Sequence, residues 1–194
     1  MITTVQCVPT RRKYAEDVFK DFKNIVYHED KNYTGCFNSF KDMLDIPFED
    51  YRLHVQDDIL ITNDLHNNLD YLQNIMSDKK IEILSLYANP RKAIREAHLK
   101  KQTIARLNPF LMMQGVVFSY DFVQMLKEEI SESRQNKYDD TFVGDVCKKR
   151  KVKAYCHIPS LVQHNLLLDS EIGNPNNPHN RKALFFDQEY FKNI

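Results

Sequence analysis

The sequence of 194 residues contains no tryptophan and only four glycines. Glycine supplies many of the tight turns of β-barrels, so this scarcity argues against a barrel with many such turns. No apolar stretch approaches the roughly 18 residues that a membrane-spanning helix requires. We therefore expect a soluble chain that has no membrane partner.

The chain carries no net formal charge, with 27 basic and 27 acidic residues. A chain with this balance is not expected to bind polyanions over its whole surface, although local basic patches could still do so. The four cysteines show no CxxC spacing, and no signal peptide precedes them; they are Cys7, Cys36, Cys147 and Cys156. This pattern predicts reduced thiols and a cytoplasmic location.

Hydrophobic residues make up 42% of the chain and charged residues 28%, which allows a core of ordinary size and argues against disorder. The length suits one domain, and we expect residues 1–194 to form it. From about residue 172 the chain becomes rich in Asn and Pro, which predicts a loop-rich C-terminal segment. That segment is either a lid that orders when a ligand binds or a plain surface loop.

Hydrophobic patterning predicts strands that alternate with helices. The expected strands cover residues 2–8, 24–27, 51–55, 81–87, 114–119 and 152–158, and the expected helices cover residues 11–23, 35–44, 65–76, 91–101 and 121–130. Such alternation is typical of α/β proteins. The sequence therefore predicts a mostly parallel, Rossmann-type sheet flanked by helices.

Two adjacent acids, Asp57 and Asp58, follow Gln56 at the end of the expected strand 51–55. Ligands of open α/β sheets gather at the carboxyl ends of the strands. Adjacent carboxylates repel each other unless a positive group lies beside them, and carboxylates suit Mg²⁺ or Mn²⁺. The pair is therefore either a cation site or an exposed acidic turn.

Two later features also carry side chains that could bind a metal or take a proton. Asp139 and Asp140 precede a helical segment, where an acid could take a proton from a hydroxyl or could cap the helix. His164 ends the sequence Pro-Ser-Leu-Val-Gln-His after the last expected strand. Its neutral imidazole could bind a metal, or the side chain could be an ordinary surface or packed residue.

The order of these features resembles that of GT-A-fold, nucleotide-sugar-dependent glycosyltransferases over roughly residues 2–175. Residues 9–11, Pro-Thr-Arg, are similar to the family's first loop, which holds the nucleotide. Asp30 stands where such enzymes place an acid near the uracil or ribose, and Gly35 and Asn38 match a sequence on the helix before the metal motif. The resemblance implies that the donor is bound by Pro9, Thr10, Arg11, Asp30, Asn38, Gln56 and Asp57.

The sequence Gln56-Asp57-Asp58 is similar to the family's DxD motif, which makes Asp58 the implied metal ligand, with His164 completing the site. Asp139-Asp140 resembles the acid pair that supplies the catalytic base in inverting members, and Asp140 is the implied base. Gln56 departs from the first acid of DxD, and Asp139 replaces the commoner Glu. The chain is also short for the family, so acceptor-binding insertions should be minimal.

The resemblance implies an inverting enzyme that uses Mn²⁺ or Mg²⁺ to move a sugar from a nucleoside diphosphate donor, expected to be a UDP-sugar, to a hydroxyl acceptor. A divalent ion stabilises charge on the leaving phosphate, and a carboxylate deprotonates the acceptor. Two other hypotheses stay open from the residues alone. One is a metal-dependent nuclease or phosphotransferase acting on nucleic acid, and the other is a non-catalytic binding module.

Basic tracts raise the question of a DNA acceptor. One comprises residues 148–151 with Lys153, and the other comprises Arg91, Lys92, Arg95, Lys100, Lys101 and Arg106. Each is either a solvated face or a surface for phosphates. The Lys- and Asn-rich composition is similar to that of phage proteins, and phages carry small glycosyltransferases that modify hydroxymethylated pyrimidines in DNA. Phe110, Phe118 and Tyr120 could stack on a flipped base or simply pack in the core.

Overall fold

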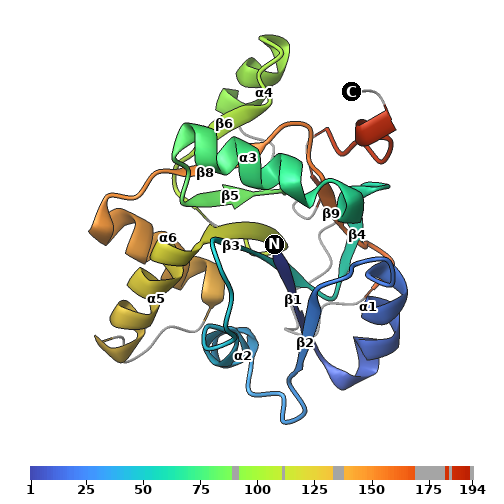
Figure 1. Cartoon of the computed structure of the whole chain (residues 1–194), viewed down its shortest axis with the longest axis vertical. Coiled ribbons are helices and arrows are strands. Elements are labelled where there is room, and N and C mark those ends of the chain that lie inside the picture. Colours follow the sequence, from blue (N-terminus) through green and yellow to red (C-terminus); the bar gives the residue numbers. More distant parts are fainter. Residues whose placement is uncertain (89–91, 111, 133–137, 169–181, 184, 193–194) are drawn as a thin grey trace.

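A computed structural model describes residues 1–88, 92–110, 112–132, 138–168, 182–183 and 185–192. Its main sheet has seven strands in the order β2-β1-β3-β7-β5-β8-β6 (Figure 1). The strands are β1 (Ile2–Cys7), β2 (Ile25–Glu29), β3 (Tyr51–Gln56), β5 (Ile83–Ser85), β6 (Ile104–Leu107), β7 (Gly115–Ser119) and β8 (Ala154–His157).

Five of these strands run in one direction. β1 pairs in parallel with both β2 and β3, and β5 pairs in parallel with β8. β7 lies antiparallel between β3 and β5, and β6 is an antiparallel edge strand on β8. The sheet is therefore mostly parallel, as the sequence predicts.

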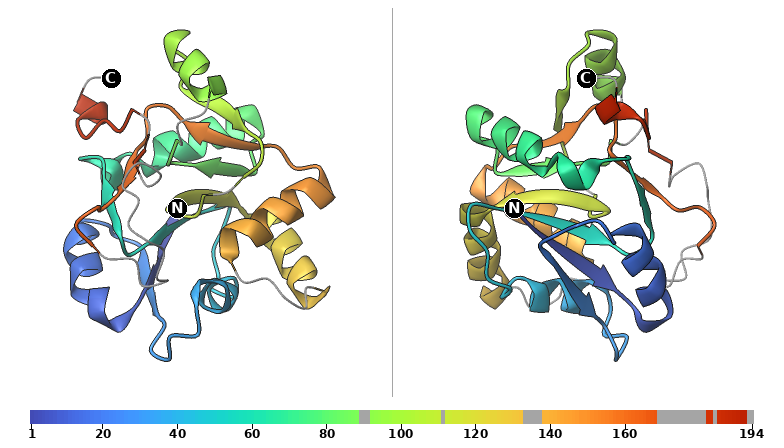
Figure 2. Two further views of the ribbon diagram at one scale, coloured as in Figure 1. Left: turned by 180° about the vertical axis from the view of Figure 1, so that it is seen from behind. Right: turned by 45° about the vertical axis from the view of Figure 1, so that its right-hand side comes forward.

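Helices cover both faces of the sheet (Figures 1 and 2). They are α1 (Arg12–Val18), α2 (Cys36–Met43), α3 (Leu69–Lys79), α4 (Lys92–Leu99), α5 (Tyr120–Glu132) and α6 (Asp139–Arg150), with short 3₁₀ turns η1 (Pro9–Arg11), η2 (Leu65–Asn67) and η3 (Tyr190–Lys192). One buried cluster joins the sheet to α2, α4, α5 and α6, and a second joins it to α1 and α3.

The alternation of side chains along β3 and β7 creates these two faces. Leu53 and Val117 pack into the cluster with α1 and α3, while Phe118 packs into the opposite cluster. Neighbouring residues of a strand point to opposite sides of the sheet, so a central strand needs apolar partners on both. Arg52 and His54 are polar exceptions on β3, and both are wholly buried. The Arg52 guanidinium donates to the Met43 carbonyl, and the His54 ring lies near the rings of Phe40 and Phe118.

Three strands were absent from the sequence prediction. β6 is a short edge strand whose four residues carry too little pattern to mark it. A second sheet, formed by β4 (Ile59–Ile61) and β9 (Val162–His164), pairs antiparallel with Ile59 opposite His164. This pairing joins segments about a hundred residues apart, and no local pattern encodes such a contact.

The first predicted helix, residues 11–23, is too long. The structure instead has η1 followed by the seven-residue α1, which ends at Val18. The N-terminal part of the Asn-Pro segment, through residue 181, lies outside the described residues. Further on, the backbone N–H of Asn63 donates to the carbonyl of Gln188, so residues near the C-terminus pack against the loop between β4 and η2.

All four cysteines are free, as expected for reduced thiols. Within the described part of the chain, no helix is long and apolar enough to cross a membrane.

Candidate functional site

The first loop and the first acid of the Asp57–Asp58 pair meet where β1 and β3 end. Because these strands are parallel neighbours, their carboxyl ends lie at the same edge of the sheet. The Val8 N–H donates to Asp57 Oδ2 at 2.8 Å, and the Arg11 guanidinium donates to Asp57 Oδ1 at 3.1 Å. Asp57 therefore holds the loop with both of its carboxylate oxygens.

Asp58 lies beside His164, as the sequence predicts for a shared cation site. The two atoms that approach are Asp58 Oδ2 and His164 Nδ1, at 3.4 Å. The β4–β9 pairing brings them together, and the Asn165 N–H fixes the Asp58 backbone by donating to its carbonyl at 2.7 Å. The Tyr87 ring packs edge-on against the imidazole.

Arg11 supplies the positive charge that adjacent acids require. Its side chain is 10% exposed, and its guanidinium lies 3.9 Å from Asp58 Oδ2 as well as 3.1 Å from Asp57. Burial raises the pKa of the Asp57 carboxyl, a rise that the Val8 N–H and Arg11 oppose and that Asp58 increases. The Asp57–Asp58 pair is not the exposed acidic turn that was the alternative reading, since Asp57 is buried and Asp58 mostly so.

The Asp139–Asp140 pair begins α6 and lies next to the end of β3. The Gln56 amide donates to Asp139 Oδ2 at 3.4 Å. Asp139 is 4% exposed, and burial raises its pKa to about 6. Asp140 is half-buried, and its Oδ1 accepts hydrogen bonds from the Thr141 N–H and hydroxyl. The two adjacent acids thus have different environments, and Asp140 is the one more open to solvent.

The remaining predicted donor residues lie around the same edge of the sheet. Pro9 and Thr10 are exposed on η1. Asp30 follows β2, and its carboxylate accepts hydrogen bonds from Thr34 and from the Gly35 N–H. Asn38 is exposed on the first turn of α2, where its side chain donates to the Thr34 carbonyl.

Gly35 has a structural reason to be glycine. Its φ of 96° lies in a region that L side chains rarely adopt, and it directly precedes α2. The Asp30 carboxylate accepts a hydrogen bond from the Gly35 N–H, so hydrogen bonds within the loop between β2 and α2 hold its shape.

Sequence reasoning missed two residues that support the Asp58 site. Asn165 donates from its side chain to the Tyr14 hydroxyl at 3.0 Å, and this hydroxyl donates to the Ile59 carbonyl at 2.8 Å. Together with the Asn165 N–H on Asp58, these bonds connect α1, β4 and the end of β9. The one available signal is that Asn165 directly follows His164.

Of the three aromatic candidates for base stacking, two are core residues and the third lies at the far end of β3 from the Asp57–Asp58 pair. Phe110 and Phe118 are buried in the core, which confirms packing as their role. Tyr120 is 47% exposed but begins α5 after β7, and the antiparallel pairing of β7 places it beside the start of β3. The site is therefore at the other end of that strand from Tyr120.

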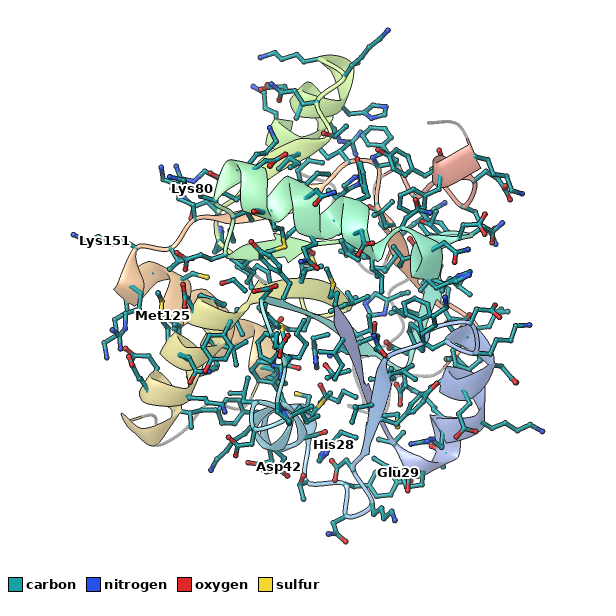
Figure 3. The ribbon with its side chains drawn as sticks, in the orientation of Figure 1. His28, Glu29, Asp42, Lys80, Met125 and Lys151 are labelled. Carbon is teal, nitrogen blue, oxygen red and sulfur yellow. The ribbon has the colours of Figure 1, made fainter. Side chains whose placement is uncertain are left out.

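The basic tract of residues 148–153 also lies away from the Asp57–Asp58 pair. The tract lies at the C-terminal end of α6, whereas Asp139 is at the N-terminal end of that helix. The Lys151 side chain points outward at the rim of the molecule (Figure 3). Lys149 and Arg150 form ion pairs with the buried carboxylate of Glu129 on α5. Of the second tract, Arg91 lies outside the described residues.

No family model matches the sequence, and no curated protein matches it. Among solved structures, the match to residues 1–349 of S. aureus TarS has a TM-score of 0.55 at 11% identity, covering 82% of this chain and 58% of that one. The same protein in complex with UDP-GlcNAc matches with a TM-score of 0.53 at 12% identity, over 82% and 56% of the two chains. A197 from STIV matches with a TM-score of 0.48 at 11% identity, over 84% of each chain.

This chain and TarS share a fold. The likeness agrees with the expected α/β architecture, in which a mostly parallel sheet has helices on both faces. The chain spans less than two thirds of the TarS segment it matches, and at 11% identity the likeness concerns the fold alone.

Proposed function

We propose that this chain transfers a sugar from a UDP-sugar to a hydroxyl acceptor. The observation that carries the proposal is the meeting of Arg11, the Asp57–Asp58 pair and His164 at the carboxyl edge of the sheet. This is the edge at which open α/β sheets bind ligands. The fold is shared with TarS, which was solved with UDP-GlcNAc bound, and this supports a nucleotide-sugar donor.

The residues present fit a divalent cation that takes most of its ligands from the donor. Asp58 and His164 offer an oxygen and a nitrogen 3.4 Å apart, close to the roughly 3 Å between adjacent ligands of an octahedral ion with bonds near 2.1 Å. No cluster of three or more His, Cys, Asp and Glu side chains suits a metal in the described part of the chain. Phosphate oxygens would complete such a site, and the ion would stabilise negative charge on the leaving diphosphate.

In the proposed reaction, the acceptor oxygen bonds to the anomeric carbon while the bond from that carbon to the diphosphate oxygen breaks. The diphosphate leaves with the electron pair, and Asp140 takes the proton of the acceptor hydroxyl. Asp140 suits this role because it is the more open acid of its pair. Attack from the face opposite the leaving group inverts the anomeric centre.

The other predicted donor residues keep distinct roles in this proposal. Asp30, Asn38 and the exposed residues Pro9 and Thr10 flank the nucleoside, while Arg11 faces the diphosphate. Gln56 acts through its side-chain amide, which donates a hydrogen bond to Asp139. No observation in the described residues favours a two-metal nuclease over this arrangement.

The test is thermal unfolding of the purified chain with UDP, GDP, ADP and dTDP, each with and without Mn²⁺. We expect UDP with Mn²⁺ to raise Tm by roughly 5–10 °C at a ligand concentration of about a hundred times Kd. UDP-sugar hydrolysis, measured as released UDP, should also require Mn²⁺ or Mg²⁺.

Asp58→Asn should abolish both effects, whereas Asp78→Asn, an exposed acid late in α3, should change neither. Retention of UDP release in Asp58→Asn would exclude the assigned cation site. Metal-dependent cleavage of labelled DNA without a sugar donor would support the nuclease instead.

A further inference from the structure

Arg11 contacts the same carboxylate oxygen that faces His164. Asp58 Oδ2 lies 3.4 Å from His164 Nδ1 and 3.9 Å from the Arg11 guanidinium nitrogen that also binds Asp57. The three side chains Arg11, Asp57 and Asp58 are only 10%, 9% and 13% exposed. Water therefore screens the charges in this group poorly.

The backbone fixes Arg11 in this position. The Arg11 N–H donates to the Val8 carbonyl at 3.0 Å, and the Val8 N–H donates to Asp57 at 2.8 Å. The turn from Val8 to Arg11, the Arg11 guanidinium and the Asp57 carboxylate thus form one hydrogen-bonded unit at the end of β1. Asp58 lies at the margin of this unit, since its distance from Arg11 is the longer one.

A divalent ion bound by Asp58 and His164 would contact the oxygen that Arg11 already faces. The ion and the guanidinium are both positive, and they would lie a few ångströms apart in a poorly screened site. Either the ion binds weakly or Arg11 withdraws from Asp58. A diphosphate offers the guanidinium a new anionic partner, because Arg binds phosphate oxygens in bidentate geometry.

We propose that Arg11 competes with the divalent cation for Asp58, and that the diphosphate of the nucleotide ends this competition by drawing the guanidinium to itself. This inference rests on the proposed function, because it concerns the same cation site. It makes the cation and the nucleotide bind cooperatively, each improving the affinity of the other by the same factor. The protein then assembles a complete site only when both are present.

The test measures Mn²⁺ binding directly, from the electron paramagnetic resonance signal of free Mn²⁺, in the full chain with and without UDP. Mn²⁺ bound to UDP in solution is measured separately and subtracted. We expect weak binding to the wild-type chain without UDP, and binding at least about fivefold tighter with it. Arg11→Gln should bind Mn²⁺ at least about fivefold more tightly without UDP and should gain correspondingly less from UDP.

Arg12→Gln is the matched control. Arg12 is the next residue, it carries the same charge, and its side chain pairs with Glu16 rather than with the Asp57–Asp58 pair. Its replacement should leave Mn²⁺ binding at the wild-type level, and Arg11→Lys, which keeps the charge, should stay close to it. If Arg11→Gln does not fold, the double variant Arg11→Gln with Asp57→Asn removes both members of the ion pair, and it should bind Mn²⁺ more tightly than Asp57→Asn alone, which lacks the same carboxylate.

Asp58→Asn separates the two ideas. If it leaves Mn²⁺ binding unchanged, the cation site itself is wrong, and the proposed function loses its metal. If it abolishes Mn²⁺ binding while Arg11→Gln binds no more tightly than wild type, the competition is overturned and the cation site stands. Tight wild-type binding that UDP does not change would also overturn the competition.

Discussion

Asp139 and Asp140 are neighbours in the sequence but differ in their surroundings. Asp139 is buried next to Gln56, whereas Asp140 is half-buried at the start of α6. An acid at position 56, as in the DxD pattern, would place a second negative charge against Asp139. The Gln56 amide donates a hydrogen bond there instead, which gives a physical reason for glutamine at this position.

The raised pKa of Asp139 predicts a pH-dependent stability. With a folded-state pKa of about 6 against an ordinary 3.8, the stability it contributes is full below pH 4 and is lost as pH rises through 6. Ionised Asp139 costs about 3 kcal/mol above that range. Asp139→Asn should therefore raise Tm relative to wild type by roughly 5 °C or more at pH 8, and by much less at pH 4.5.

Circular dichroism melts across this pH range measure the difference. Asp145→Asn, an exposed residue of the same helix, is the control and should keep the wild-type pH dependence. An Asp139→Asn effect that is equal at both pH values would contradict the assignment of the titrating group.

At the scale of elements, α6 carries groups of opposite charge at its two ends. Its first turn contains the Asp139–Asp140 pair, and its last turn contains Lys148, Lys149 and Arg150. Acids at a helix N-terminus and bases at its C-terminus both interact favourably with the helix dipole. The same helix therefore places the proposed base at the site and holds α5 through Glu129 at its other end.

Gly144 allows α6 to approach the chain at Phe110. A Cβ at Gly144 would lie 2.7 Å from the Phe110 carbonyl oxygen, which belongs to the backbone and cannot rotate away. Alanine improves helix propensity by about 1 kcal/mol, but overpacking costs about 1–3 kcal/mol. Gly144→Ala should therefore lower Tm by a few degrees, whereas Asp145→Ala, on the exposed face, should not. A rise in Tm for Gly144→Ala would contradict the close contact.

At the scale of the whole molecule, the hypothesis of a DNA acceptor requires the DNA to span a set distance. Lys148 and Lys149 lie two turns or more beyond Asp140 on α6, so they are about 12–14 Å from the proposed base along the helix axis. DNA held by these lysines would have to extend along most of the helix to present a hydroxyl at Asp140. In the described part of the chain, no ion pair involves Lys148, Lys151 or Lys153.

The DNA hypothesis predicts that replacing these three lysines with alanine weakens duplex binding. If each contacts one phosphate, the slope of log K against log salt should fall in magnitude by roughly 2.7. Fluorescence anisotropy with labelled duplex at several salt concentrations measures it. Lys149→Ala, whose charge is paired with Glu129, is the control and should have a smaller effect. An unchanged slope in the triple variant would remove this tract as a DNA contact.

The sequence by itself determined most of the local elements and the chemical types at the site. Apolar alternation marked the central strands, because neighbouring strand residues face opposite sides, and the strand ends marked Asp57 and Asp58. Only the tertiary structure decided which side chains lie in contact. The pairing of β4 with β9 brings His164 next to Asp58, and the turn after β1 brings Arg11 next to both Asp57 and Asp58. These contacts depend on strand pairing and burial across the whole chain, which no short stretch of sequence encodes.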